Sequence, residues 1–215
     1  MPSTRTVASI GAILTFAALL LQYWLQFRAM PGASPLAVTW RYFGYFTILT
    51  NSLVCVTWTV AAREGDGRHR SILEGIALTN IVMVGLIYHL LLAGTWRPEG
   101  AQWVADFIVH TVTPILFAVY WLARPHGALK WWNAVTFMAW PLAYCIYALV
   151  RGAFDGWYAY WFLNPAPTSL PILALSILAQ SVAFIAAGLG VIALDKKLAA
   201  RASRSPQPSA SPSAP

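Results

Sequence analysis

Charged side chains are scarce in this chain. Asp, Glu, Lys and Arg make up 10% of its 215 residues, and only seven residues are acidic. An ordinary soluble domain carries about 25% charged residues. Together with a hydrophobic share of 59%, this shortage excludes an ordinary soluble domain and predicts a chain that lies mostly in an apolar medium.

Several chemical signatures are also absent. The two cysteines, Cys55 and Cys145, lie inside apolar stretches, so they predict small buried side chains and not a disulfide framework. The sequence has no HExxH or CxxC metal-binding spacing, no Gly-rich phosphate loop and no GxSxG nucleophile elbow. We therefore expect no cofactor. A metal site built from His89, Asp106 and His110 is a weaker alternative, because no ligand spacing supports it.

Long apolar runs take up most of the chain. They cover residues 7–27, 42–62, 75–96, 100–123, 131–150 and 168–194. Each run reaches the roughly 20 residues that a helix needs to cross about 30 Å of hydrocarbon, where backbone groups must bond within their own segment. We expect residues 1–198 to form one all-α domain, an integral membrane bundle of six transmembrane helices. The Ser/Pro/Ala-rich residues 199–215 are expected to form a disordered cytoplasmic tail.

The basic residues are distributed unequally between the two ends of the expected bundle. Ten lie on one side, namely Arg5, Arg63, Arg68, Arg70, Arg124, Lys130, Lys196, Lys197, Arg201 and Arg204. Four lie on the other side, namely Arg28, Arg41, Arg97 and Arg151. By the positive-inside rule, both termini are predicted to be cytoplasmic. The net charge of +7 then reflects topology and attraction to anionic lipid, and we expect no binding of nucleic acid.

Two polar side chains are predicted to lie at one depth in the bundle. Thr47 follows Arg41 by six residues and His110 follows Trp103 by seven. At 1.5 Å per residue, these spacings place them about 9 and 10 Å inside the same boundary. His89 reaches a similar depth. A hydroxyl and an imidazole at one level could form a nucleophile and base pair.

Helical periodicity adds further polar groups to these two positions. Thr47 shares a helix face with Asn51, and His110 shares one with Asp106, each at a spacing of four residues. The same pattern is compatible with purely structural roles. The hydroxyl of Thr47 could bond its own helix backbone, and His110 could be a neutral packing histidine, although an ionisable group at membrane depth is by default a functional hypothesis.

Three short segments resemble a known family. Residues 45–49 (YFTIL) resemble a Tyr-Leu-Thr-Phe-Leu type segment, and residues 110–114 (HTVTP) resemble a His-bearing span with a Thr and a Pro shortly after the His. Residues 157–164 (WYAYWFLN) resemble a Trp-x-Tyr-Pro-Phe-Leu motif, with Trp161 in place of the proline. All three are similar to segments of the androgen-induced protein family. Its members are multi-span lipid hydrolases that cleave fatty acid esters of hydroxy fatty acids.

The resemblance extends to the six-span bacterial branch of that family. That branch carries an Arg-Gly…Gly-Trp-Tyr-x-Tyr-x-Phe-Leu pattern like residues 151–163 here. The resemblance implies a location in the plasma (inner) membrane, and partners that are the bilayer and a lipid ester. It leaves the oligomeric state undetermined.

The resemblance also implies roles for individual residues. A threonine nucleophile and its histidine partner correspond to Thr47 and His110. Beside them, we expect Asn51 to be a candidate oxyanion donor and Asp106 to orient His110, with His89 as a further possible support. The predicted function is hydrolysis of long-chain fatty acyl esters within the bilayer. The alternative is a non-enzymatic protein that binds lipid or transports a small solute.

Overall fold

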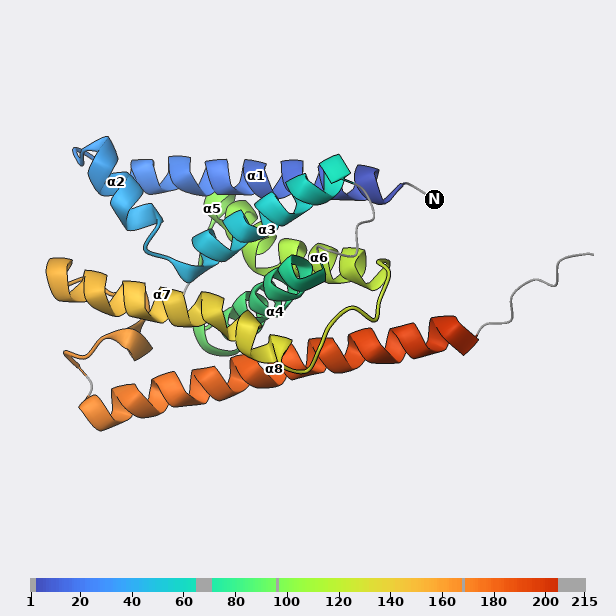
Figure 1. Cartoon of the computed structure of the whole chain (residues 1–215). Helices are drawn as coiled ribbons and strands as arrows, with labels where there is room; N and C mark the ends of the chain where they lie inside the picture. The colour runs from blue at the N-terminus through green and yellow to red at the C-terminus, as the bar shows by residue number, and fades with distance from the viewer. Residues whose placement is uncertain (1–2, 65–70, 96, 168, 205–215) are drawn as a thin grey trace, which may run out of the picture.

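The computed structural model describes residues 3–64, 71–95, 97–167 and 169–204 (Figure 1). Arg68 and Arg70 of the basic end, residue 96 at the end of the third apolar run, residue 168 at the start of the sixth and residues 205–215 of the tail lie outside the described part. Within the described residues the regular secondary structure is entirely helical, as the sequence predicts.

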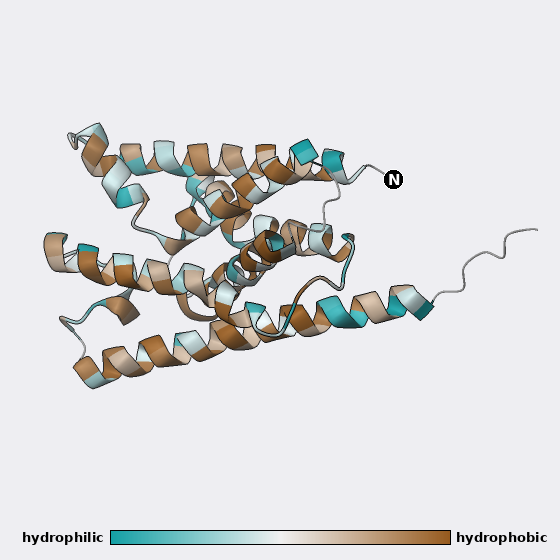
Figure 2. Ribbon diagram, in the orientation of Figure 1, coloured by the Kyte–Doolittle hydropathy of each residue, from teal (hydrophilic) through white to brown (hydrophobic). Residues whose placement is uncertain are grey.

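Five helical segments are long and apolar enough to cross a membrane. They are α1 (Thr4–Ala29); α4 (Ser71–Ile87) continued by η2 (Tyr88–Leu92); α5 (Gly100–Phe107), η3 (Ile108–Val112) and α6 (Thr113–Leu122) as one rod; α7 (Asn133–Asp155); and α8 (Leu170–Arg204). Hydrophobic residues prevail along these helices (Figure 2).

The second apolar run is not one continuous helix. It is divided between α2 (Pro35–Tyr42) and α3 (Phe46–Glu64), which are bent by 83° relative to each other. Gly44 lies in the break, where an added Cβ would collide with the side chains of Arg151 and Trp157. The described residues therefore hold five spans, or six if the bent pair crosses as one.

The last helix is longer than the sequence pattern predicts. α8 continues to Arg204, so residues 199–204, which we expected to belong to a disordered tail, are helical. Ala, Leu, Lys and Arg are strong helix formers and dominate residues 196–204.

α4 occupies the centre of the bundle. It packs against α3, α6, α7 and α8, while α1 packs mainly on α3 and α7 packs on α8. The core between these helices contains the fully buried rings of Trp58, Phe117 and Phe137. Cys55 and Cys145 are both free.

The chain begins and ends at the same end of the bundle. The start of α1 and the end of α8 lie on the right in Figure 1, whereas the connection from α1 to α2 and residues 156–167 lie on the left.

Candidate functional site

Two turns of π-helix face each other where α4 meets the α5–η3–α6 rod. His110 lies in η3, and Tyr88 lies in η2. Pro114 follows His110 by four residues and has no N–H, so the carbonyl of His110 loses its ordinary helical donor. Single π turns inside α-helices occur frequently at functional sites. The interruption at η3 sets the direction in which the imidazole of His110 points.

Thr47 and His110 are in contact. The Oγ1 atom of Thr47 lies 3.2 Å from Nε2 of His110. Other hydroxyls on α3, at Ser52, Thr57 and Thr59, donate to the carbonyl four residues earlier. Thr47 is the second residue of α3, and no helical turn precedes it. Its hydroxyl therefore bonds across to another helix, which excludes a role limited to bonding its own backbone.

Asp106 holds the other nitrogen of the imidazole. Nδ1 of His110 lies 3.0 Å from the backbone oxygen of Asp106 and 3.3 Å from its Oδ1 atom. Both groups accept hydrogen bonds, so they favour the tautomer with the proton on Nδ1. Nε2 is then the acceptor for the Thr47 hydroxyl. The order hydroxyl, imidazole, carboxylate is that of a hydrolytic triad.

Tyr88 lies flat against the imidazole and was not predicted as a site residue. Its ring stacks on His110 with centroids 3.9 Å apart and planes at 12°. The stacking prevents His110 from rotating away from Thr47. The sequence carries no signal for this contact, because it depends on the packing of η2 against η3.

Tyr160 is a second site residue that the sequence did not predict. Its hydroxyl oxygen accepts a hydrogen bond from the backbone N–H of Thr47 at 3.5 Å. Burial raises the pKa of Tyr160, so the phenol keeps its proton and can donate it to an oxygen beside Thr47. The cluster of aromatic residues at 157–162 was the sequence feature that could have indicated a role for Tyr160.

Asn51 does not serve as the free donor that we expected. Its Nδ2 atom donates to the backbone oxygens of Thr47, at 2.9 Å, and Val109, at 3.2 Å. An amide nitrogen has two hydrogens, and both are used. Asn51 instead ties α3 to η3 and fixes the separation of Thr47 from His110.

His89 lies outside the site. Its Nε2 atom pairs with Oγ1 of Thr111 at 3.0 Å in an exposed position, because its position in η2 directs it away from Thr47. In the described part of the chain no three His, Cys, Asp or Glu side chains are placed to hold a metal ion.

Thr47 stands between two cavities. The larger one, of about 450 Å³, is lined by the three triad residues and by Gln22, Gln26 and Gln102, among others. We call it the polar chamber. Thr47, Tyr88, Leu92 and Tyr160 line the second cavity as well.

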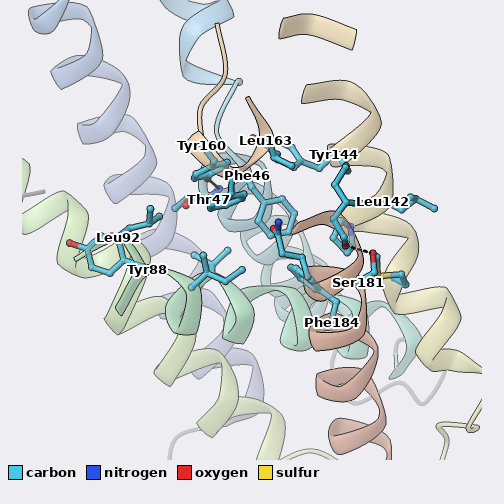
Figure 3. A pocket seen from close by; sticks show the side chains of 18 residues that line it. Phe46, Thr47, Tyr88, Leu92, Leu142, Tyr144, Tyr160, Leu163, Ser181 and Phe184 are labelled. Carbon is cyan, nitrogen blue, oxygen red and sulfur yellow. Dashed lines mark hydrogen bonds between the residues drawn. The ribbon is translucent and has the colours of Figure 1, made fainter. Parts of the chain in front are cut away.

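The second cavity is apolar. It has a volume of about 60 Å³ and lies between η2, α7 and α8. We call it the apolar groove. Figure 3 shows Tyr88 and Leu92 on one side of it, and Leu142 and Ser181 on the other. Leu142 is 48% exposed, so the groove reaches the outer surface of the bundle.

Comparisons with known proteins give no match. The chain matches no protein-family model, and neither the curated proteins nor the solved structures contain a match. The residues and their geometry are therefore the basis for assigning a function.

Proposed function

We propose that the protein is a membrane-embedded ester hydrolase in which Thr47 is the nucleophile and His110 the general base. The observation that carries this proposal is the chain of contacts from Thr47 through His110 to Asp106, with heavy-atom distances of 3.2 and 3.3 Å. General bases act within about 2.6–3.2 Å of the proton they remove. The segments that resemble the androgen-induced protein family support the same two residues.

The reaction would be an acyl transfer in two steps. His110 takes the proton of Thr47 as Oγ1 attacks the ester carbonyl carbon. The tetrahedral intermediate then expels the alcohol, which receives the proton from His110. In the second step His110 deprotonates a water molecule, and the resulting hydroxide attacks the acyl-threonine. The fatty acid leaves, and the hydroxyl of Thr47 is restored.

Two groups support the charge that develops in this reaction. Asp106 faces the imidazole that becomes positive. The hydroxyl of Tyr160 lies beside Thr47, where it can donate to the oxyanion. Thr47 also stands at the N-terminus of α3, where the helix dipole favours negative charge.

The membrane setting follows from the apolar helices. We propose that α2 and α3 together make the sixth span, that both termini face the cytoplasm of a bacterial cell, and that the substrate is a long-chain lipid ester drawn from the plasma membrane. The excess of Lys and Arg at the end of the bundle that holds the termini supports this orientation.

Labelling with a fluorophosphonate probe tests the nucleophile. We expect the probe to attach to Thr47 in the purified protein, and the site is read by mass spectrometry. Labelling should be lost in Thr47→Ala and strongly reduced in His110→Ala. Thr59→Ala is the matched control, because the hydroxyl of Thr59 donates to the carbonyl of Cys55 in its own helix and does not line either cavity.

Hydrolysis of a long-chain ester should follow the same pattern. Thr47→Ala and His110→Ala should each abolish turnover, and the double variant should be no worse than either, since the two groups act as one unit. Thr47→Ser should keep part of the activity. Interhelical hydrogen bonds in membranes are worth only about 0.6 kcal/mol on average, so the variants should remain folded. Monodisperse Thr47→Ala protein that turns over ester at the parent rate would disprove the mechanism and favour lipid binding or transport.

A further inference from the structure

The polar chamber contains an unusual concentration of amide side chains. The chain has five glutamines, and three of them, Gln22, Gln26 and Gln102, line this chamber. Nε2 of Gln102 donates to Oε1 of Gln22 at 3.0 Å. That bond leaves the Oε1 atom of Gln102 and the Nε2 atom of Gln22 available, so the pair presents both acceptors and donors to the chamber. Such a pair suits hydroxyl groups, which both donate and accept.

The charge in the chamber points to a neutral ligand. Among its lining residues in the described part of the chain there is no Lys or Arg, and the single acidic residue is Asp106. The carboxylate of Asp106 already faces His110. An anionic group in the chamber would meet repulsion from Asp106 and find no cation to compensate it. A carboxylate or phosphate is therefore a poor occupant.

The chamber and the apolar groove also fix the orientation of an ester at Thr47. The groove reaches the outer surface at Leu142, whereas the lining of the chamber includes the exposed residues Ala29, at the end of α1, and Thr95, just after η2. The apolar lining of the groove suits the first carbons of an acyl chain, and the rest of the chain would extend into hydrocarbon. The alcohol then occupies the chamber, on the side nearer to water.

We propose that the polar chamber binds a neutral alcohol with several hydroxyl groups, so that the substrate is a long-chain acyl ester of a glycerol-type polyol. This inference rests on the proposed hydrolase function. It goes beyond that function because it names the alcohol and excludes an ester whose alcohol carries a carboxylate. The amide pair of Gln22 and Gln102 receives the hydroxyl groups, and Thr47 attacks the carbonyl between the two cavities.

Four oleoyl esters test the proposal on the purified full-length protein. They are 1-oleoyl glycerol, the oleoyl ester of a hydroxy fatty acid, oleoyl choline and methyl oleate. We expect kcat/KM to be highest for 1-oleoyl glycerol, by about tenfold over methyl oleate, which corresponds to one or two hydrogen bonds. A preference for the hydroxy acid ester or for the choline ester would overturn the proposal, and so would equal rates on all four.

Substitution of Gln22 and Gln102 tests whether this amide pair binds the alcohol. Gln22→Leu and Gln102→Leu should lower the ratio of kcat/KM for 1-oleoyl glycerol to that for methyl oleate by about tenfold. Thr59→Val, which also replaces a polar group on a helix, is the control and should leave the ratio unchanged. An unaltered ratio in both glutamine variants would overturn the assignment of the chamber.

Failure of the alcohol assignment and failure of the hydrolase function give different results. If methyl oleate is hydrolysed and Thr47 is labelled but the glycerol ester has no advantage, the alcohol assignment is wrong and the hydrolase stands. If none of the four esters is hydrolysed and the fluorophosphonate probe does not attach, the hydrolase itself is wrong, and the substrate assignment falls with it.

Discussion

Asp106 contacts the imidazole of His110 through two different oxygens. The backbone oxygen lies 3.0 Å from Nδ1 and the carboxylate oxygen 3.3 Å from it. In a serine protease triad, replacing the aspartate by asparagine gives the wrong tautomer and lowers kcat about 10⁴-fold. Here the backbone carbonyl keeps Nδ1 protonated without the carboxylate. In the proposed reaction, the remaining role of the carboxylate is to stabilise the imidazolium that forms.

Asp106→Asn should therefore be milder than the same change in a protease. We expect kcat to fall about 10²-fold or less, with little change in KM, because the tautomer of His110 is kept by the carbonyl. Steady-state kinetics on methyl oleate measure the loss. A fall of about 10⁴-fold would mean that the carboxylate, and not the carbonyl, sets the tautomer.

Tyr160→Phe tests the proposed oxyanion donor. The change removes one hydroxyl and keeps the ring, which stacks on Phe162 with centroids 5.2 Å apart. Loss of one oxyanion donor typically lowers kcat about 10²–10³-fold, and we expect that range here with KM nearly unchanged. Tyr147→Phe is the control, because its hydroxyl donates to the carbonyl of Phe43 outside the site. A rise in KM alone would assign Tyr160 to substrate binding.

At the scale of the helices, the level of a residue along the bundle could be predicted from the sequence. The direction in which its side chain points could not. Thr47 and His110 meet, as counting from the run ends predicted, although residues 41–47 include the 83° bend between α2 and α3 and are not one straight helix. The contacts of Asn51 and His89 differ from those we expected, because they depend on which way each side chain points. The π turns η2 and η3 rotate the helix face, and no periodicity of 3.6 residues anticipates that rotation.

The bend between α2 and α3 also could not be predicted from the sequence pattern. Residues 42–62 carry no charged side chain and are mostly apolar, which predicts one helix. The break depends on Gly44 lying against Arg151 and Trp157, which are more than a hundred residues away in the chain. Tyr88 and Tyr160 were missed for the same reason, because their contacts with the site are set by tertiary packing.

Pro114→Ala tests whether η3 positions His110. Alanine supplies the N–H that the carbonyl of His110 lacks, so the π turn can close into a regular α-helix. We expect kcat to fall at least about tenfold as the imidazole moves from Thr47, while the melting temperature stays equal or rises. Activity equal to that of the parent protein would show that the proline does not set the position of His110.

At the scale of the whole molecule, the position of the termini can be checked directly. We expect the C-terminal tail to be cytoplasmic, because the basic residues gather at the end of the bundle where α1 begins and α8 ends. A tag placed after residue 215 should be protected from protease in intact cells and digested in inverted membrane vesicles. Digestion in intact cells would show that the protein has the opposite orientation, with the polar chamber open to the cytoplasm.

The division between the polar chamber and the apolar groove leads to a prediction about the length of the acyl chain that the protein accepts. Ser181 lies on α8 and lines the apolar groove opposite Tyr88 (Figure 3). Its hydroxyl donates to the carbonyl of Ile177 in its own helix, so a substitution there removes a bond within α8 and not one between helices. Ala183, two residues further on, is exposed on the outer surface of α8.

Ser181→Trp should convert the protein into a short-chain esterase. The indole would fill the groove, of about 60 Å³, and exclude a long acyl chain, whereas an acetyl group needs no groove. We expect kcat/KM for a long-chain ester to fall about 10²-fold, with the acetyl ester of the same alcohol nearly unaffected. Ala183→Trp introduces the same ring away from the groove and should change neither rate. Equal losses on both esters with Ser181→Trp would mean that the ring disturbs Thr47 itself, and unchanged rates on both would place the acyl chain elsewhere.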